Sequence, residues 1–161
     1  MDELDYQILK FLKDNSRMRV SAISQKVNLS VTAVIDRIKK LENAGIIKQY
    51  TVVINPEKIG KDITAFISVS LEHPKHNNEF IEMIMLHNEV LECHYITGDY
   101  DFLLKIVTGG SGSLEKVLTY IKSLHGVALT RTLVVLSTVK NEISILPEVR
   151  KTKKAKGEQE K

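Results

Sequence analysis

Hydrophobic residues early in the chain recur at the spacing of two short helices joined by a tight turn. Ile23 and Val27 lie four residues apart and form one apolar stripe. The stretch Asn28-Leu29-Ser30 supplies turn chemistry and ends on Ser30, a good helix N-cap. A second helix is predicted from Ser30 to Asn43. Its buried face carries Val34, Ile38 and Leu41, with Ile35 beside them.

The first residues of the chain predict another helix ahead of this pair. Asp2 can cap it with Asp5 at the third position, and its inner stripe holds Leu4, Ile8, Phe11 and Leu12. Gly45 should end the last of the three helices, and a short strand pair, including 50–54, should follow. Three helices and a strand pair predict a winged or homeodomain-like helix-turn-helix DNA-binding unit. An αα-hairpin in an ordinary core has the same spacing and stays open on spacing alone.

A differently patterned domain follows the Pro- and Gly-bracketed stretch 55–60. Strands are predicted at 63–71, 91–97, 102–108 and 128–138, with a helix capped by Asn77 or Asn78 and a second helix from Leu114 after the loop 109–113. The order βαββαβ predicts a ferredoxin-like α+β domain. The expected organisation is a helix-turn-helix domain (1–54), a linker (55–60), the ferredoxin-like domain (61–147) and a basic, disordered tail (148–161).

The last predicted strand carries apolar groups on both faces. Thr130, Thr132 and Val134 alternate with Leu129 and Leu133. Two helices cover only one face of a four-stranded sheet, so the other face needs a partner. The economical partner is the same face of a second subunit, which predicts a homodimer.

Several motifs in order resemble the Lrp/AsnC (feast/famine) transcriptional regulators. The resemblance covers nearly everything before the tail, and it rests on MDELDYQIL, Arg17, NLS at 28–30, V-x-x-R-I-x-x-L-E-x-x-G-I-I-x-x-Y from Val34 to Tyr50, TGDYDFLLK at 97–105 and GVALTRTLVVL at 126–136. Arg19 departs from it, because the family usually has a small capping residue there. Ser21 or water is then left to cap the second helix.

The resemblance implies binding to double-stranded DNA through the helix that begins after Ser30. The expected DNA contacts are Ser30, Val31, Thr32, Asp36, Arg37, Lys39 and Lys40. Asp36 and Lys40 also form an i,i+4 pair, so part of this charge is expected to be used on the helix surface. The resemblance also implies a homodimer. Dimers of this family commonly assemble further into octamers, and the sequence alone does not fix the state beyond the dimer.

The stretch Gly98-Asp99-Tyr100-Asp101 combines a permissive backbone, two carboxylates and an aromatic wall. On residues alone, a plain hairpin turn with two solvated acids is the simpler interpretation. The resemblance implies an amino-acid effector site at this turn, with Thr130 and Thr132 nearby.

Composition is consistent with a small cytoplasmic regulator. The chain has 161 residues, 43% of them hydrophobic, a net charge of +3 and a single cysteine, Cys93. No intrachain disulfide is possible, and a reducing compartment is expected. The longest apolar runs are too short for a membrane span, and acids directly after Met1 argue against a secretory signal. Positive charge is concentrated in residues 1–60 and in the tail, which suits a polyanionic partner.

Other chemistry is weakly indicated. The five histidines, His73, His76, His87, His94 and His125, show no metal-binding spacing, so neither a metal nor a cofactor is expected. No catalytic triad or phosphate loop stands out, which argues against an enzyme. Two alternatives stay open: an enzyme on this scaffold, since some heme-pathway decarboxylases resemble the family, and a ligand-independent DNA-compacting protein.

Overall fold

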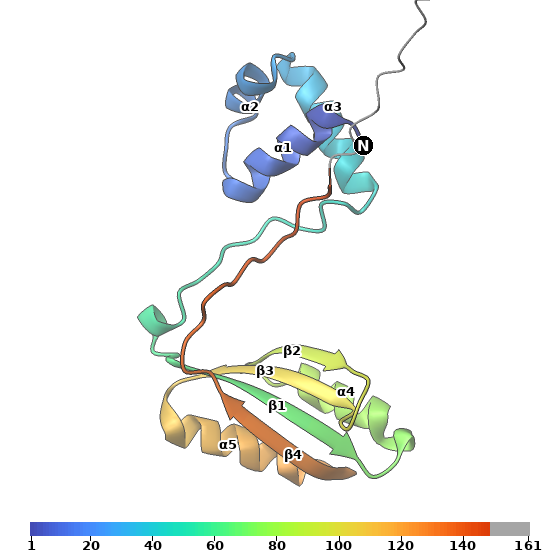
Figure 1. Ribbon diagram of the computed structural model, residues 1–161, viewed down its shortest axis with the longest axis vertical. Helices are drawn as coiled ribbons and strands as arrows, with labels where there is room; N and C mark the ends of the chain where they lie inside the picture. The colour runs from blue at the N-terminus through green and yellow to red at the C-terminus, as the bar shows by residue number, and fades with distance from the viewer. Residues whose placement is uncertain (149–161) are drawn as a thin grey trace, which may run out of the picture. The chain divides into compact units, whose positions relative to one another are not determined.

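The computed structural model describes residues 1–148 and divides the chain into two compact units (Figure 1). Met1–Val53 forms the first unit together with the described residues 141–148, and Ile54–Lys140 forms the second. The predicted linker, 55–60, thus groups with the second unit, where Glu57–Ile59 makes a short 3-10 helix, η1. Residues 141–147, predicted in the second domain, group with the first, where Lys13 Nζ and a Glu142 carboxylate oxygen lie 2.8 Å apart. The predicted tail lies outside the described residues, apart from position 148.

The first unit is a three-helix bundle built as its apolar stripes predict. Its helices are α1 (Glu3–Asp14), α2 (Val20–Val27) and α3 (Val31–Asn43). Asp2 and Asp5 form a reciprocal capping box on α1. The Ser30 hydroxyl accepts a bond from Ala33 N and caps α3. Arg19 occupies the N-cap position of α2, and no side chain caps that helix. The core contains Ile8, Ile23, Val27 and Val34. Ile35, predicted beside the buried face, is exposed.

The predicted strand at 50–54 is wrong. The described residues after α3 form no strand until β1, and Val52, Val53 and Ile54 are exposed. A strand is held by hydrogen bonds to a neighbour, and none of the described residues forms a ladder with this segment. Apolar side chains in sequence can predict an extended backbone, but they cannot supply the partner.

The second unit has the predicted βαββαβ order. Its elements are β1 (Ile63–Leu71), η2 (Pro74–His76), α4 (Asn77–Met85), β2 (Val90–Tyr95), β3 (Phe102–Thr108), α5 (Gly110–Ser123) and β4 (Val127–Val134). The strands form one antiparallel sheet in the order β2-β3-β1-β4, and α4 and α5 lie on one of its faces (Figure 1). The architecture is therefore the ferredoxin-like α+β plan.

Element boundaries in this unit differ from the predicted ones. The last strand, predicted at 128–138, ends at Val134. The loop predicted at 109–113 is mostly the first turn of α5, because an Asp62 carboxylate oxygen accepts a bond from Gly110 N at 3.0 Å and supports the helix start. Gly109 lies so close to the carbonyl oxygen of Gly60 that a Cβ would collide with it. α4 begins at Asn77 and has His76 in the N-cap position, so neither predicted asparagine is the cap.

Register separates the two faces of the sheet. Ala65, Ile67 and Val69 are buried under the helices, and they lie opposite Val134, Thr132 and Thr130 of β4. The other face, which we call the open face, carries Phe66, Leu103, Lys105, Leu129, Arg131 and Leu133. Leu129 is 56% exposed and Leu133 is 53% exposed. The single chain therefore leaves leucines of its central sheet in water, as the alternation in the last strand predicts.

Within residues 1–148, no helix has both the length and the apolar character that a membrane crossing requires.

Candidate functional site

The exposed side of α3 holds most of the predicted DNA contacts. Thr32, Asp36, Lys39 and Lys40 face solvent, while Val34 and Leu41 on the opposite side are buried. Ser30 and Val31 lie at the N-terminal end of the same helix. No ion pair joins Asp36 to Lys40 among the described residues. Both lysine charges on this side are therefore available to an anion.

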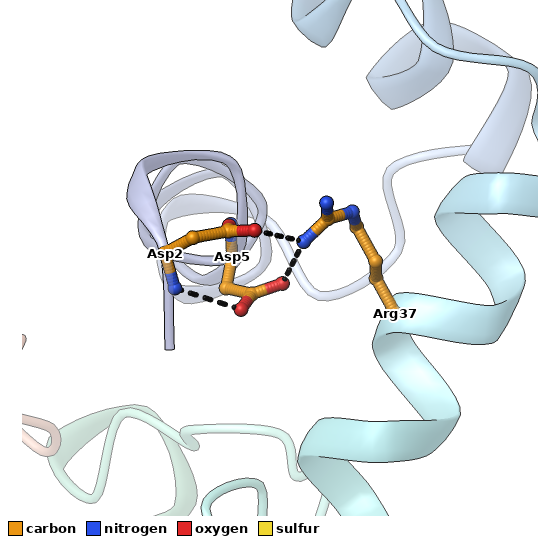
Figure 2. Close-up of polar contacts among 3 residues, drawn as sticks. All are labelled: Asp2, Asp5 and Arg37. Atoms are coloured by element: carbon orange, nitrogen blue, oxygen red, sulfur yellow. Dashed lines mark hydrogen bonds and ion pairs between the residues drawn. The ribbon is translucent and has the colours of Figure 1, made fainter.

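Arg37 is positioned differently from the other predicted contacts. Its Nη1 donates to Asp2 Oδ2 at 2.7 Å and to Asp5 Oδ1 at 2.6 Å (Figure 2). The side chain is 28% exposed. The two carboxylates raise the pKa of Arg37 above its usual value. The pKa of Asp2 is lowered, first by the bond from Asp5 N and then by Arg37.

This geometry ties α3 to the first turn of α1. The capping box orients Asp2 and Asp5, and Arg37 reaches both carboxylates from the neighbouring helix (Figure 2). Sequence reasoning explained the two acids fully as helix caps, so their third partner was missed. That Arg37 contacts DNA stays a prediction, and the structure adds a role in holding the bundle together.

We expect Arg37→Ala to destabilise the first unit by about 1–2 kcal/mol. Bonds to charged groups typically contribute about 1.5–3 kcal/mol, and partial exposure reduces that figure through solvent screening. Folding lowers the pKa of Asp2, so the ionised carboxylate stabilises the folded state. This stabilisation is fully present above the ordinary aspartate pKa, about 3.9, and is lost as the pH falls through the lowered value. In thermal unfolding, the difference in melting temperature between Arg37→Ala and the wild type should shrink as the pH is lowered from 7 into this acidic range.

Lys39→Ala is the matched control for this measurement, because Lys39 lies on α3 and has no ion pair among the described residues. Its melting temperature should stay near the wild-type value. An Arg37→Ala protein that melts like wild type but loses DNA affinity would assign Arg37 to the DNA-contacting surface instead.

The turn between β2 and β3 is fixed to the end of β1. Gly98 has a φ of 119°, a conformation that side chains rarely adopt. Asp101 N donates to the carbonyl of Val69, and Asp101 Oδ2 accepts from Leu71 N at 2.8 Å. The Ser70 hydroxyl donates to the Asp99 carbonyl at 3.1 Å. One oxygen of Asp101 therefore holds the turn in place, and Oδ1 has no bond among those found in residues 1–148.

Ser70 and Leu71 were missed as partners of this turn. Sequence reasoning identified 98–101 as a local hairpin, and nothing in the spacing shows that it also lies against a strand 30 positions earlier. Contact with β1 makes the turn more rigid than a solvated hairpin. A rigid turn suits a binding site, because less conformational entropy is lost when a ligand binds.

Thr130 and Thr132 do not join the turn directly in the single chain. They lie on β4 opposite Val69 and Ile67, on the face covered by the helices. β1 separates β4 from β3, and no hydrogen bond among the described residues links either threonine to residues 98–101. The predicted effector residues thus occupy one sheet as two groups, the turn and the β4 threonines.

Comparison with known proteins matches both units. A family model described as a winged helix-turn-helix DNA-binding domain matches residues 1–48, and one described as the Lrp/AsnC ligand binding domain matches residues 64–145. The HTH-type transcriptional regulator FL11 of Pyrococcus abyssi is 35% identical over 147 residues, covering 91% of this chain and 96% of that protein. The leucine-responsive regulatory protein of Haemophilus influenzae is 35% identical over 143 residues, covering 87% and 86%.

Solved structures agree over almost the whole chain. A transcriptional regulator of Neisseria meningitidis in complex with L-methionine superposes with a TM-score of 0.86 at 32% identity, covering 90% of this chain and 96% of that chain. AsnC of E. coli superposes with a TM-score of 0.85 at 28% identity, covering 91% and 99%. With a helix-turn-helix unit followed by a ligand-binding domain of the same kind, the chain belongs to the Lrp/AsnC family of DNA-binding transcriptional regulators.

Proposed function

We propose that this protein binds a defined DNA site as a dimer, and that an amino acid bound beside the turn at 98–101 changes that binding. The observation that carries the proposal is that the two sides of α3 differ in burial and polarity. Its apolar side closes the three-helix core, while Thr32, Asp36, Lys39 and Lys40 stay exposed on the other side. A helix presented in this way can enter the major groove, where polar side chains read base edges and lysines contact phosphates.

Dimerisation is supported by the open face. Its leucines would be buried if two copies packed face to face, and the resulting two-fold dimer would carry two helix-turn-helix units. Exposed apolar side chains outside the sheet, among them Val52, Val139 and Ile145, are further surface for a second copy. A dimer with two helix-turn-helix units matches a palindromic DNA site with two half-sites.

An amino-acid effector is supported by the relatives and by the chemistry of the turn. One relative is named as leucine-responsive, and one solved neighbour holds L-methionine. In this chain, Asp101 Oδ1 can accept bonds from an α-ammonium group, and Gly98 leaves the backbone open to close approach. Asp99 and Tyr100 would complete the polar and aromatic walls of such a site.

The DNA part of the proposal is tested by salt dependence on a site selected from a random duplex library. Lys40→Ala should weaken binding and reduce the log–log salt slope by roughly one unit, because one phosphate contact is lost. Lys116→Ala, an exposed lysine on α5, is the matched control and should leave both quantities unchanged. Wild-type affinity and slope in Lys40→Ala would remove α3 from the DNA interface.

Footprinting on the same duplex distinguishes regulation from compaction. A defined protected site supports the operator-binding proposal. Protection that extends along any sequence with equal affinity would favour the DNA-compacting alternative instead.

A further inference from the structure

Two histidines and a glutamate meet at the start of α4, far in sequence from the other predicted chemistry. His76 ends η2 and occupies the N-cap position of α4, and Glu79 lies in the first turn of that helix. His125 follows α5, just before β4. One donor atom from each of the three side chains lies within 4.8 Å of the other two. His125 Nδ1 is already 3.2 Å from a Glu79 carboxylate oxygen.

His76 is the fixed member of this cluster. It is only 6% exposed, and its ring makes no hydrogen bond to any other described residue. The ring meets that of His125 edge to face, with centroids 4.5 Å apart. It also packs directly on Gly126, where a Cβ would collide with it. The backbone therefore holds an unpaired imidazole beside Glu79 and His125.

The ring nitrogens of His76 are not sealed off. Within residues 1–148, no side-chain nitrogen or oxygen is both shut away from solvent and without a partner. Since the His76 ring has no such partner, its nitrogens must keep some access to solvent. A pocket of about 300 Å³ is lined by two members of the cluster, Glu79 and His125, together with Tyr120.

An ordinary histidine–glutamate pair elsewhere in the chain shows what distinguishes this cluster. His94 also lies 3.2 Å from a carboxylate, that of Glu92, but Lys105 Nζ bonds to the same carboxylate at 2.8 Å and balances its charge. No lysine or arginine in the described part of the chain pairs with Glu79. At Glu79 the neighbouring groups are two imidazoles, which are neutral metal ligands when deprotonated.

We propose that His76, Glu79 and His125 bind one divalent transition-metal ion of the Zn²⁺ class. Two imidazoles and one carboxylate form a known zinc donor set that leaves a fourth position to water. Mg²⁺ and Ca²⁺ prefer all-oxygen sites and fit this set poorly. The bound ion joins the start of α4 to the turn between α5 and β4.

Binding requires a modest closure of the cluster. Tetrahedral ligands about 2.0–2.2 Å from zinc lie roughly 3.3–3.5 Å from one another. The His125 and Glu79 side chains are 71% and 58% exposed, so they are free to rotate toward the buried His76. His76 is thus the buried, fixed ligand, and Glu79 and His125 are the exposed ligands that adjust their positions.

The test is calorimetric titration of untagged, chelator-treated full-length protein with ZnCl₂. We expect one ion per chain and a rise in the melting temperature of several degrees at saturating zinc, because the ion binds the folded state. Glu79→Gln and His125→Ala should each lose at least about tenfold in affinity, since even the outer-shell partners of metal ligands typically contribute that much. Both residues are exposed, so the variants should fold, and metal-free melting curves check this.

Two variants control for adventitious binding. His94→Gln removes a surface histidine–glutamate pair, and Cys93→Ser removes the single thiol; both should keep wild-type zinc affinity. Substituted Co²⁺ should give a visible absorption band that Glu79→Gln changes and His94→Gln does not. Equal zinc affinity in all variants, loss of binding only in Cys93→Ser, or an equal response to MgCl₂ would each overturn the proposal.

Discussion

Leu133→Asp is expected to convert a dimer into a folded monomer. Leu133 lies on the open face opposite Phe66 of β1, and Leu129 lies on the same face of β4. In a two-fold interface the substitution buries one unpaired carboxylate from each subunit. An uncompensated buried charge costs about 3–5 kcal/mol, so the dimer dissociation constant should rise by at least about a thousandfold. Sedimentation of wild type and variant across a concentration series measures this change.

Leu86→Asp is the matched control for this experiment. Leu86 is also an exposed leucine, but it follows α4 and so lies away from the strands of the open face. That variant should sediment as the wild type does. Thermal unfolding would show whether the Leu133→Asp monomer is folded. A wild-type monomer at micromolar concentration, or an unaffected Leu133→Asp dimer, would contradict the proposed open-face interface.

The helices of the first unit could be predicted from sequence because their determinants are local. Ile23 and Val27, four residues apart, need no distant information to define a helical stripe, and Ser30 caps α3 through a bond to Ala33. The strands of the second unit were predictable for the same reason, since alternation along β1 and β3 reports which face is buried. Local patterns therefore gave the elements and their order.

Contacts between elements were out of reach of the same reasoning. Arg37 reads as one more basic residue on an exposed helix, yet two carboxylates more than 30 positions away bind it. His76 and His125 show no metal-ligand spacing, because the sheet and its two helices, rather than the sequence interval, bring them together. The strand predicted at 50–54 is the opposite case. Its local pattern favours an extended backbone, but no segment within residues 1–148 pairs with it.

Asp101 has both a local and a distant determinant, and the sequence left open whether its role is structural or in ligand binding. The turn could be recognised locally, but the bond from Leu71 N to Asp101 Oδ2 could not. That bond supports a structural role for one carboxylate oxygen. The other oxygen and the negative charge are the groups proposed to bind a ligand ammonium. A substitution that keeps the acceptor and removes the charge therefore distinguishes the two roles.

Asp101→Asn should retain the melting temperature of the wild type, because an amide oxygen can still accept the bond from Leu71 N. Its affinity for the amino acid that most raises the wild-type melting temperature should fall roughly ten- to hundredfold, since a charge-assisted hydrogen bond contributes about 1.5–3 kcal/mol. Asp101→Ala removes both interactions and should lose affinity and thermal stability together. Glu82→Gln, an exposed acid on α4, controls for the loss of a charge alone. If a stable Asp101→Asn protein kept the wild-type ligand affinity, Asp101 would have only a structural role, through the bond from Leu71 N.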